Sequence, residues 1–212
     1  MKRRVPLFPL GLVLLPRMPL PLHIFEERYR LMIRRCLEEE TEFGVLLARG
    51  SKIEPLGTLA RIDSVINRYE DGRLDILTVG TERITVEEFH TNAPYLQGFV
   101  ERLHDNPSAE EDSLPARASR AIDALESFAS QAGYSIDREL LATLEYEELS
   151  FFIASTDVFS LEEKQQLLRM RDTGRRLAQV TAGLIELADQ RRQADQVRQL
   201  LGSDKDITHL FN

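Results

Sequence analysis

The most constraining feature of this 212-residue sequence is the uneven distribution of proline, glycine and alanine along it. Seven of the nine prolines and seven of the eleven glycines lie in residues 1–103, whereas thirteen of the sixteen alanines follow. Proline and glycine favour the turns between strands, and alanine favours helix. Residues 104–114 are polar and rich in helix breakers, as is typical of a linker. We therefore predict a β-rich domain at 1–103, a linker at 104–114 and a helical domain at 115–212.

Alternating polarity in one run, β-branched residues in two others and a short apolar run predict several short strands in the first domain. These runs lie at residues 43–48, 59–66, 74–79, 83–89 and 95–103. Asp71-Gly72 supplies the residues of a tight hairpin turn, and Gly98 marks a bulge or a close backbone approach. Short antiparallel strands of this kind favour a small closed or half-closed barrel. One amphipathic helix interrupts the strands, with an apolar stripe formed by Phe25, Tyr29, Met32, Ile33, Cys36 and Leu37.

The second domain shows helical periodicity throughout. Pro115 suits the first turn of a helix that ends near Gly133. Ser160 and Glu163 form a capping box at the start of a later helix. Two short helices between these carry Leu140, Leu141 and Leu144, and then Leu149, Phe152 and Ile153. A long final helix runs from Thr173 towards Gly202 with a stripe of Leu177, Val180, Leu184 and Leu187. We expect this stripe to pack on the preceding helices, and pairing with a second copy of the chain is the less favoured alternative.

The sequence contains little that resembles catalytic machinery. It has neither a phosphate-binding Gly-x-x-x-x-Gly-Lys-Ser/Thr loop nor a Gly-x-Gly-x-x-Gly turn nor a Gly-x-Ser-x-Gly elbow. The four histidines are far apart, and a single cysteine cannot build a zinc site from cysteines. Cys36 with His23 is the one conceivable thiol–imidazole pair, but Cys36 falls on an apolar stripe, where cysteine behaves as a small hydrophobe. We predict no catalytic residue, no metal and no cofactor.

Charge argues against a nucleic-acid partner. Residues 1–103 carry fifteen basic and fifteen acidic residues, so the formal net charge of −8 belongs entirely to the second half. Arg28, Arg30, Arg34 and Arg35 are flanked on the same predicted helix by Glu26, Glu27, Glu38 and Glu39, whereas nucleic-acid binding requires a sustained basic surface. The acidic runs at 38–40 and 110–112 lack the spacing of an EF-hand loop, so we expect them to be solvated.

The N-terminal segment carries no targeting signal that we recognise. Its apolar stretch from Val5 to Leu15 is interrupted by Pro6, Pro9 and Gly11, and helical signal sequences do not tolerate this density of breakers. No apolar run approaches the roughly 18 residues of a membrane span. We expect a cytoplasmic protein with an intact N-terminus.

Several motifs, taken together, resemble one known family. They are Val5-Pro-Leu-Phe-Pro-Leu10, Val13-Leu-Leu-Pro16, Leu20-Pro-Leu-His-Ile-Phe-Glu26, Arg28-Tyr-Arg-Leu-Met-Ile33, Leu56-Gly-Thr-Leu-Ala60, Val79-Gly-Thr-Glu-Arg-Ile84 and Leu161-Glu-Glu-Lys-Gln-Gln-Leu-Leu168. In order and spacing they resemble the N-terminal substrate-binding domain family of Lon protease. The resemblance implies an α+β fold: a PUA-like β pseudo-barrel with one helix, followed by a helical bundle ending in a long helix.

The resemblance also implies polypeptide recognition rather than hydrolysis. Full-length Lon proteins continue into an ATPase module and a Ser-Lys peptidase module, and Ser51-Lys52 do not resemble the context of that dyad. We therefore expect a stand-alone, non-enzymatic module that binds unfolded or exposed apolar segments of other polypeptides. It would act as an adaptor in proteolysis or quality control, beside a protease or a chaperone. Two alternatives remain open: an RNA- or nucleotide-binding protein, by analogy with PUA-like barrels, and a small hydrolase that uses Cys36.

The segment from Val5 to Phe25 is the candidate binding element. Its prolines preorganise an extended backbone, which lowers the entropy lost when side chains are presented to a partner. We expect most of its apolar side chains to lie in the barrel core, because exposed apolar patches are rare on monomers. Leu14, Leu15 and Met18 lie nearest the proline-rich bend, so we predict that these three form an exposed binding rim.

Overall fold

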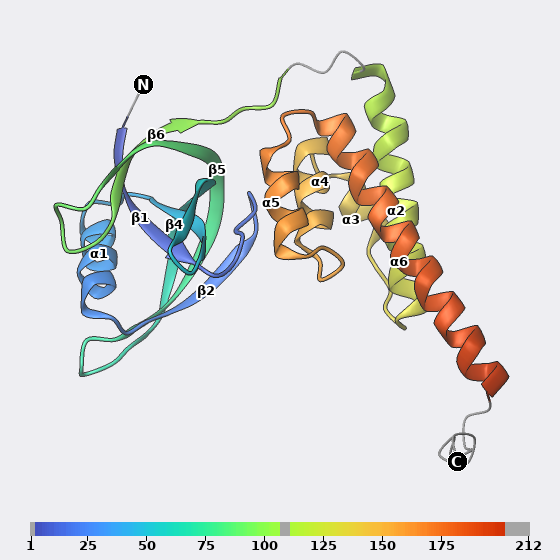
Figure 1. The fold of residues 1–212 in the computed structure, drawn as a ribbon, viewed down its shortest axis with the longest axis horizontal. Helices are drawn as coiled ribbons and strands as arrows, with labels where there is room; N and C mark the ends of the chain where they lie inside the picture. Colours follow the sequence, from blue (N-terminus) through green and yellow to red (C-terminus); the bar gives the residue numbers. More distant parts are fainter. Residues whose placement is uncertain (1–2, 107–110, 202–212) are drawn as a thin grey trace.

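The computed structural model describes residues 3–106 and 111–201. A strand-rich module occupies the first half of the chain, and a set of helices lies beside it (Figure 1). The last strand ends at Arg102, and a short 3-10 turn at Glu111–Ser113 precedes the first helix of the second half.

Six strands form the first module. They are β1 (Arg3–Leu10), β2 (Pro19–Ile24), β3 (Phe43–Arg49), β4 (Lys52–Arg68), β5 (Leu74–His90) and β6 (Gln97–Arg102). They pair in the order β2-β5-β4-β3-β1-β6, and β5 also pairs with β6. Five strands therefore close a ring, while β2 is added beside the first half of β5. The β1–β3 pair is parallel and the others are antiparallel. This confirms the predicted pseudo-barrel.

The strands differ from the sequence prediction in two ways: β1 and β2 were not among the predicted runs, and the others differ in length. The runs at 74–79 and 83–89 are one continuous strand, because Gly80 stays within the ladder and pairs with Ala60 of β4. The hairpin turn lies where Asp71-Gly72 predicted it, but five residues connect β4 to β5 and only Gly72 has a positive φ. Gly98 does mark a close approach, since a Cβ there would lie 2.8 Å from Leu7 and Val86.

The chain before β2 crosses β5 at Gly80. The Arg17 amide donates to the Gly80 carbonyl (2.8 Å), and the Gly80 amide donates to the Met18 carbonyl (2.9 Å). A Cβ on residue 80 would lie 2.4 Å from the carbonyl oxygen of Leu15. Because that obstacle is backbone, a side chain at this position would have to displace the crossing segment.

Gly80→Ala is therefore expected to lower the free energy of unfolding by about 1–3 kcal/mol, as overpacking in a well-packed site does. Urea denaturation followed by circular dichroism measures it. Gly11→Ala is the matched control, because a Cβ at Gly11 has nothing within 4 Å and its φ is not positive. Equal urea midpoints for the two variants would show that the segment crossing β5 at Gly80 can move aside without loss of stability.

The buried side of helix α1 (Glu27–Glu38) belongs to an apolar cluster that also contains residues of β1, β2, β3, β4 and β5. Its buried residues pack against Ile24, Leu74 and Ile76; they are Tyr29, Met32, Ile33 and Cys36. The predicted stripe is thus confirmed over these four positions. It is wrong at Phe25, which precedes the helix and is 61% exposed.

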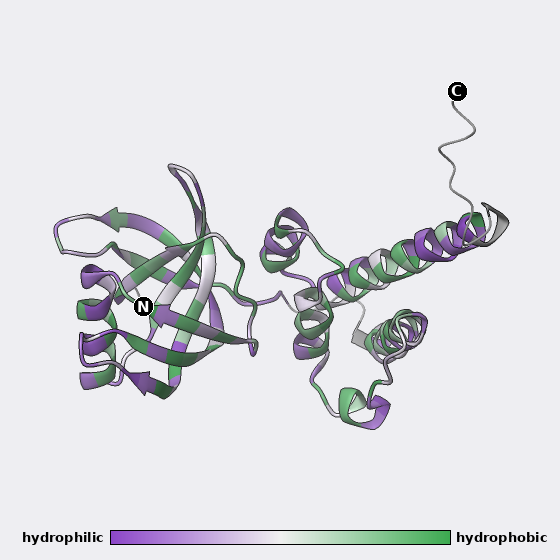
Figure 2. Ribbon diagram, turned by 90° about the horizontal axis from the view of Figure 1, so that it is seen from below, coloured by the Kyte–Doolittle hydropathy of each residue, from purple (hydrophilic) through white to green (hydrophobic). Residues whose placement is uncertain are grey.

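The second half is helical, as predicted. It contains α2 (Leu114–Gln131), α3 (Arg138–Ala142), α4 (Tyr146–Ser155), α5 (Leu161–Arg169) and α6 (Thr173–Leu201). The Ser160–Glu163 capping box is present. Figure 2 shows that hydrophilic residues dominate the far end of α6. No helix among residues 3–106 and 111–201 is long and apolar enough to cross a membrane.

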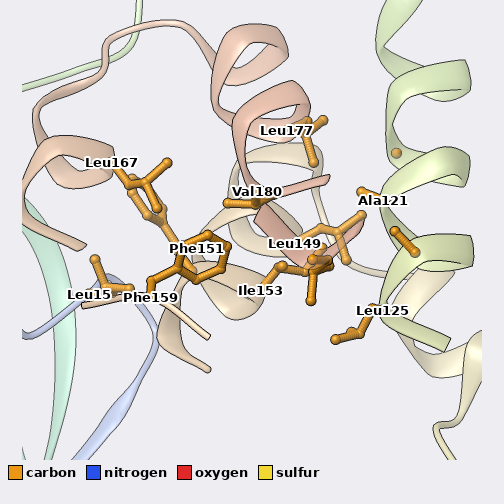
Figure 3. Close-up of a cluster of buried hydrophobic side chains, with 14 of the residues drawn as sticks. Leu15, Ala121, Leu125, Leu149, Phe151, Ile153, Phe159, Leu167, Leu177 and Val180 are labelled. Carbon is orange, nitrogen blue, oxygen red and sulfur yellow. The ribbon is translucent and has the colours of Figure 1, made fainter. Parts of the chain in front are cut away.

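The core of the helical half forms around α4 and α6 (Figure 3). Leu177, Val180 and Leu184 are fully buried there, as the stripe predicted, and Leu187 is half-buried. On α4, the prediction of Phe152 in the apolar face is wrong: Phe151 is fully buried and Phe152 is 36% exposed. The helix is rotated so that the ring of Phe151 lies against the guanidinium groups of Arg83 and Arg176.

Buried charges join the two halves. Arg83 of β5 and Arg176 of α6 are almost completely buried, and both pair with Asp105. Arg83 also donates to the carbonyls of Leu168 (3.1 Å) and Met170 (2.7 Å). Arg176 donates to the Ser150 hydroxyl (2.7 Å). These bonds satisfy most guanidinium donors, so they hold the barrel against the helices.

Candidate functional site

The binding rim was predicted to be exposed, but the structure buries most of it. Leu14 and Leu15 are 4% and 1% exposed, and Met18 is half-buried. Leu14 packs in the cluster beneath α1, whereas Leu15 enters the core of the helical half (Figure 3). The Thr58 hydroxyl donates to the Leu14 carbonyl (2.6 Å). The prediction of exposure is therefore wrong for Leu14 and Leu15, because the bend is clamped between the two halves.

The exposed apolar residues of the same segment lie further along, on β2. Here the side chains alternate: Leu20, Leu22 and Ile24 pack inwards beneath α1, while Pro19 and Pro21 are exposed. His23 and Phe25 continue the exposed series. This period-2 pattern is visible in the sequence and indicates the surface, although Phe25 also fits the helical spacing of the stripe that follows it.

The strand register extends this surface across β5. Pro19 lies opposite Val79, Pro21 opposite Leu77 and His23 opposite Asp75. Leu77 and Val79 are half-buried and belong to none of the three apolar clusters formed by the described residues. Their neighbours in sequence, Ile76 and Thr78, are fully buried on the inner side. We call this surface the outer face: Pro19, Pro21, His23, Phe25, Leu77 and Val79.

A polar cluster fixes one end of the outer face. His23 Nδ1 is 2.6 Å from Asp75 Oδ1, and the Tyr69 hydroxyl donates to Asp75 Oδ2 (2.7 Å). The hydrogen bonds from His23 and Tyr69 hold the pKa of Asp75 below its usual range, so the carboxylate stays ionised as their acceptor. The Phe25 ring stacks on the imidazole with 5.9 Å between centroids. The arrangement presents Phe25 to solvent in a fixed place.

The free edge of β2 is unsuited to pairing with another strand. Pro19 and Pro21 have no N–H, so this edge cannot supply a regular ladder of donors. The outer face therefore offers side chains rather than backbone groups to a partner. Contacts of this kind tolerate many partner sequences, since apolar burial has no directional requirement.

An acidic cleft of about 460 Å³ lies between the barrel and α4. Arg17, whose amide bonds to Gly80 next to Val79, lies on its β side and pairs with Glu148 (2.9 Å). Glu145 and Glu147 also line the cleft, with Phe151. A polypeptide lying on the outer face would thus meet carboxylates at this end.

The alternative sites identified in the sequence have structural roles. Cys36 is 2% exposed, and burial raises the pKa of its thiol to about 11. The imidazole of His23 is bonded to Asp75 instead, which argues against an activated thiol. Arg28 and Arg35 pair with Glu26 and Glu39 on the surface. Within the part of the chain that the structure describes, no three His, Cys, Asp or Glu side chains gather as a metal site would require.

Comparison with known proteins gives a consistent result. The family model for the ATP-dependent protease La (LON) substrate-binding domain matches residues 4–185. The Lon protease of Desulfosudis oleivorans is 23% identical over 214 residues, which cover 95% of this chain and 26% of that protein. The chain spans between 21% and 26% of the length of five curated relatives that it matches.

Solved structures show the same fold. A Lon N-terminal domain protein from Xanthomonas campestris has a TM-score of 0.66 and 27% identity, covering 85% of this chain and 98% of that one. The N-terminal domain of the Mycobacterium avium complex Lon protease has a TM-score of 0.70 and 17% identity, covering 86% and 98%. The match over residues 4–185 includes both halves of the chain and the outer face. The chain belongs to the LON substrate-binding domain family.

Proposed function

We propose that this chain recognises polypeptides by binding their exposed apolar segments on the outer face. The observation that carries the proposal is that Leu77 and Val79 are apolar and outward-facing, yet outside every core cluster of the described residues. The family's substrate-binding role supports it. Exposed apolar surface of this kind marks interaction sites on soluble proteins.

The test uses a labelled 20-residue peptide with a central Leu-Phe-Leu-Val between glycine–serine flanks, and its all-serine counterpart. The variant Phe25→Ser/Leu77→Thr/Val79→Thr is expected to weaken binding of the apolar peptide about tenfold or more, as loss of central apolar anchors does. Threonine keeps the β preference of the strand. Fluorescence anisotropy gives the affinity, and circular dichroism checks the fold.

The matched control removes exposed apolar side chains elsewhere. Tyr134 and Leu140 of the helical half are 73% and 61% exposed, so Tyr134→Ser/Leu140→Thr deletes comparable surface. This control should bind as the wild type does. Equal loss in both variants, or equal affinity for the apolar and all-serine peptides, would refute a site on the outer face.

RNA binding is the competing function, and salt distinguishes the two. A protein that makes six to ten phosphate contacts binds nucleic acid roughly 10³–10⁵ times more weakly at 200 mM salt than at 50 mM salt. We expect no saturable binding of a 20-nucleotide oligouridylate, and apolar-peptide binding that salt leaves nearly unchanged. Tight, salt-sensitive oligouridylate binding would favour the RNA alternative.

We further propose that the module acts as an adaptor in the cytoplasm, delivering bound polypeptides to a separate protease or chaperone without cleaving them. The Lon proteases among its relatives support a proteolytic context. The acidic cleft beside the outer face favours clients with basic residues next to their apolar segment. Cleavage of the apolar peptide or ATP hydrolysis by the purified chain would contradict the adaptor role.

A further inference from the structure

Two irregularities in β4 change which of its side chains face solvent. The register between β4 and β5 shifts between Ile62 and Ser64. It shifts again between Val65 and Asn67, where Ile66 is the extra residue. An extra residue of this kind forms a β-bulge, which bends the strand and re-aims side chains. Because side chains alternate along a strand, a shift of one residue moves the following side chains to the other face.

The first of these shifts turns Ile66 outwards. Ile62 is half-buried against the apolar cluster beneath α1, so strict alternation would also direct Ile66, four positions later, inwards. Instead, Val65 packs against that cluster and Ile66 is 63% exposed. Ile66 belongs to none of the three apolar clusters formed by the described residues. The irregular strand thus directs to solvent an apolar side chain that a regular strand would bury.

Ile66 lies on the same side of the sheet as the outer face. Two pairs show this: Ser64 lies opposite Leu77, and Asn67 lies opposite Asp75. Residues directly opposite each other on neighbouring strands share a face, and diagonal neighbours are close enough for long side chains to touch. Because Ile66 comes between these two β4 residues, its side chain is a diagonal neighbour of Leu77. The apolar part of the outer face therefore continues from β5 onto a third strand.

Ile66 and Phe25 lie on opposite sides of the polar cluster of the outer face. Phe25 stacks on His23 of β2, and Ile66 lies on β4, with Asp75 of β5 between the two strands. Neighbouring strands are about 4.8 Å apart, so β2 and β4 are separated by roughly 10 Å. An extended polypeptide advances about 3.3 Å per residue, so a run of about four residues spans this distance.

We propose that Ile66 is a specificity-determining residue of the outer face, which selects polypeptides whose apolar run is long enough to contact both Phe25 and Ile66. This inference rests on the proposed function of the outer face. The bound run crosses the strands, from β2 over Leu77 of β5 to β4, instead of following one strand. A run of two apolar residues contacts one end only, so it binds more weakly.

The test uses the full chain and the labelled Leu-Phe-Leu-Val peptide, with two shortened forms in which either the first two or the last two apolar residues are serine. Ile66→Thr is expected to weaken binding of the Leu-Phe-Leu-Val peptide about fivefold or more. Its effect should vanish for one shortened peptide and persist for the other, and Phe25→Ser should show the reverse pattern. This reciprocal coupling assigns each end of the peptide to one residue, which a purely structural effect of either substitution would not do.

Two further variants serve as controls. Ile66→Leu keeps the apolar area, so it should bind the Leu-Phe-Leu-Val peptide nearly as the wild type does. Ile185→Thr makes the matched substitution on α6 of the helical half, where Ile185 is 49% exposed, and it should leave the affinity unchanged. Circular dichroism checks the fold of each variant. Equal effects of Ile66→Thr and Ile185→Thr would overturn the proposal, as would loss of the Ile66→Thr and Phe25→Ser effects with the same shortened peptide.

The outer-face triple variant separates this inference from the proposed function. If the triple variant weakens binding while Ile66→Thr binds as the wild type does, the outer face is the binding site and the role of Ile66 is wrong. If the triple variant also binds as the wild type does, both proposals fail. Sedimentation showing a dimer that Ile66→Thr dissociates would overturn the role of Ile66 in client selection, because a second copy of the chain would then cover it.

Discussion

Replacing Asp105 with asparagine is expected to lower the free energy of unfolding by about 3–5 kcal/mol. The carboxylate pairs with Arg83 and Arg176, whose side chains are 1% and 0% exposed. Removing it leaves two buried positive charges, and the partial contact of Arg83 with Glu147 (3.2 Å) compensates for only one of them. A buried charge without its partner is among the most destabilising changes in a folded protein.

Urea denaturation monitored by circular dichroism measures this loss. Asp63→Asn is the control, because Asp63 is an exposed strand residue 3.8 Å from an exposed arginine, and such pairs contribute at most about 1 kcal/mol. If Asp105→Asn cost no more than Asp63→Asn, the buried network would not be what holds the two halves together.

The same carboxylate makes the wild type sensitive to acid. Burial by itself raises the pKa of Asp105, but the hydrogen bonds and charges of Arg176, Thr173 and Arg83 outweigh it and leave the pKa below the ordinary 3.8. A lowered folded-state pKa stabilises the fold above the unfolded-state value, and this contribution is lost as the pH falls through the folded-state value. The stability difference between wild type and Asp105→Asn should therefore be constant near neutral pH and shrink as the pH falls through 3.8 and below it.

The second large effect is expected at Phe151. Truncating this fully buried ring to alanine should cost about 3–5 kcal/mol, through lost apolar burial and the cavity left behind. The ring also lies beneath two guanidinium groups, 4.1 Å from that of Arg176 and 5.2 Å from that of Arg83. Phe151→Leu keeps most of the apolar volume but loses these cation–π contacts, so it should cost about 1–2 kcal/mol.

The neighbouring residue provides the control for this series. Phe152 is 36% exposed on the same helix, so Phe152→Ala should cost less than about 1 kcal/mol. Denaturant midpoints for the three variants give the order directly. If Phe152→Ala lowered the free energy of unfolding as much as Phe151→Ala, α4 would have to be rotated about its axis so that Phe152 also faces the core.

Local patterns in the sequence predicted the elements well. The capping box depends only on Ser160 and Glu163, three positions apart, and α6 buries Leu177, Val180 and Leu184 as their spacing indicated. Such signals need no knowledge of the rest of the chain. The five predicted strand runs all fall on observed strands, but the break at Gly80 was wrong, β4 begins at Lys52 rather than at residue 59, and β1 and β2 were not among the predicted runs.

Long-range contacts explain what the sequence could not show. Asp105 lies in a polar stretch typical of a linker, and its role comes from arginines 22 and 71 positions away. Leu14 and Leu15 look like exposed residues beside a bend, but the crossing at Gly80 places each in a different core. The outer face was accessible to sequence reasoning, because Pro19 and Pro21 alternate with inward-facing leucines.

The most direct measurement of the central claim is methyl and aromatic NMR of the full chain during titration with the apolar peptide. We expect saturable shifts of the Leu77 and Val79 methyl signals and of the Phe25 ring signals, while the methyl signals of Leu177 and Leu184 in the helical core stay unchanged. Shifts confined to the helical half, with Leu77, Val79 and Phe25 unmoved at saturation, would contradict it.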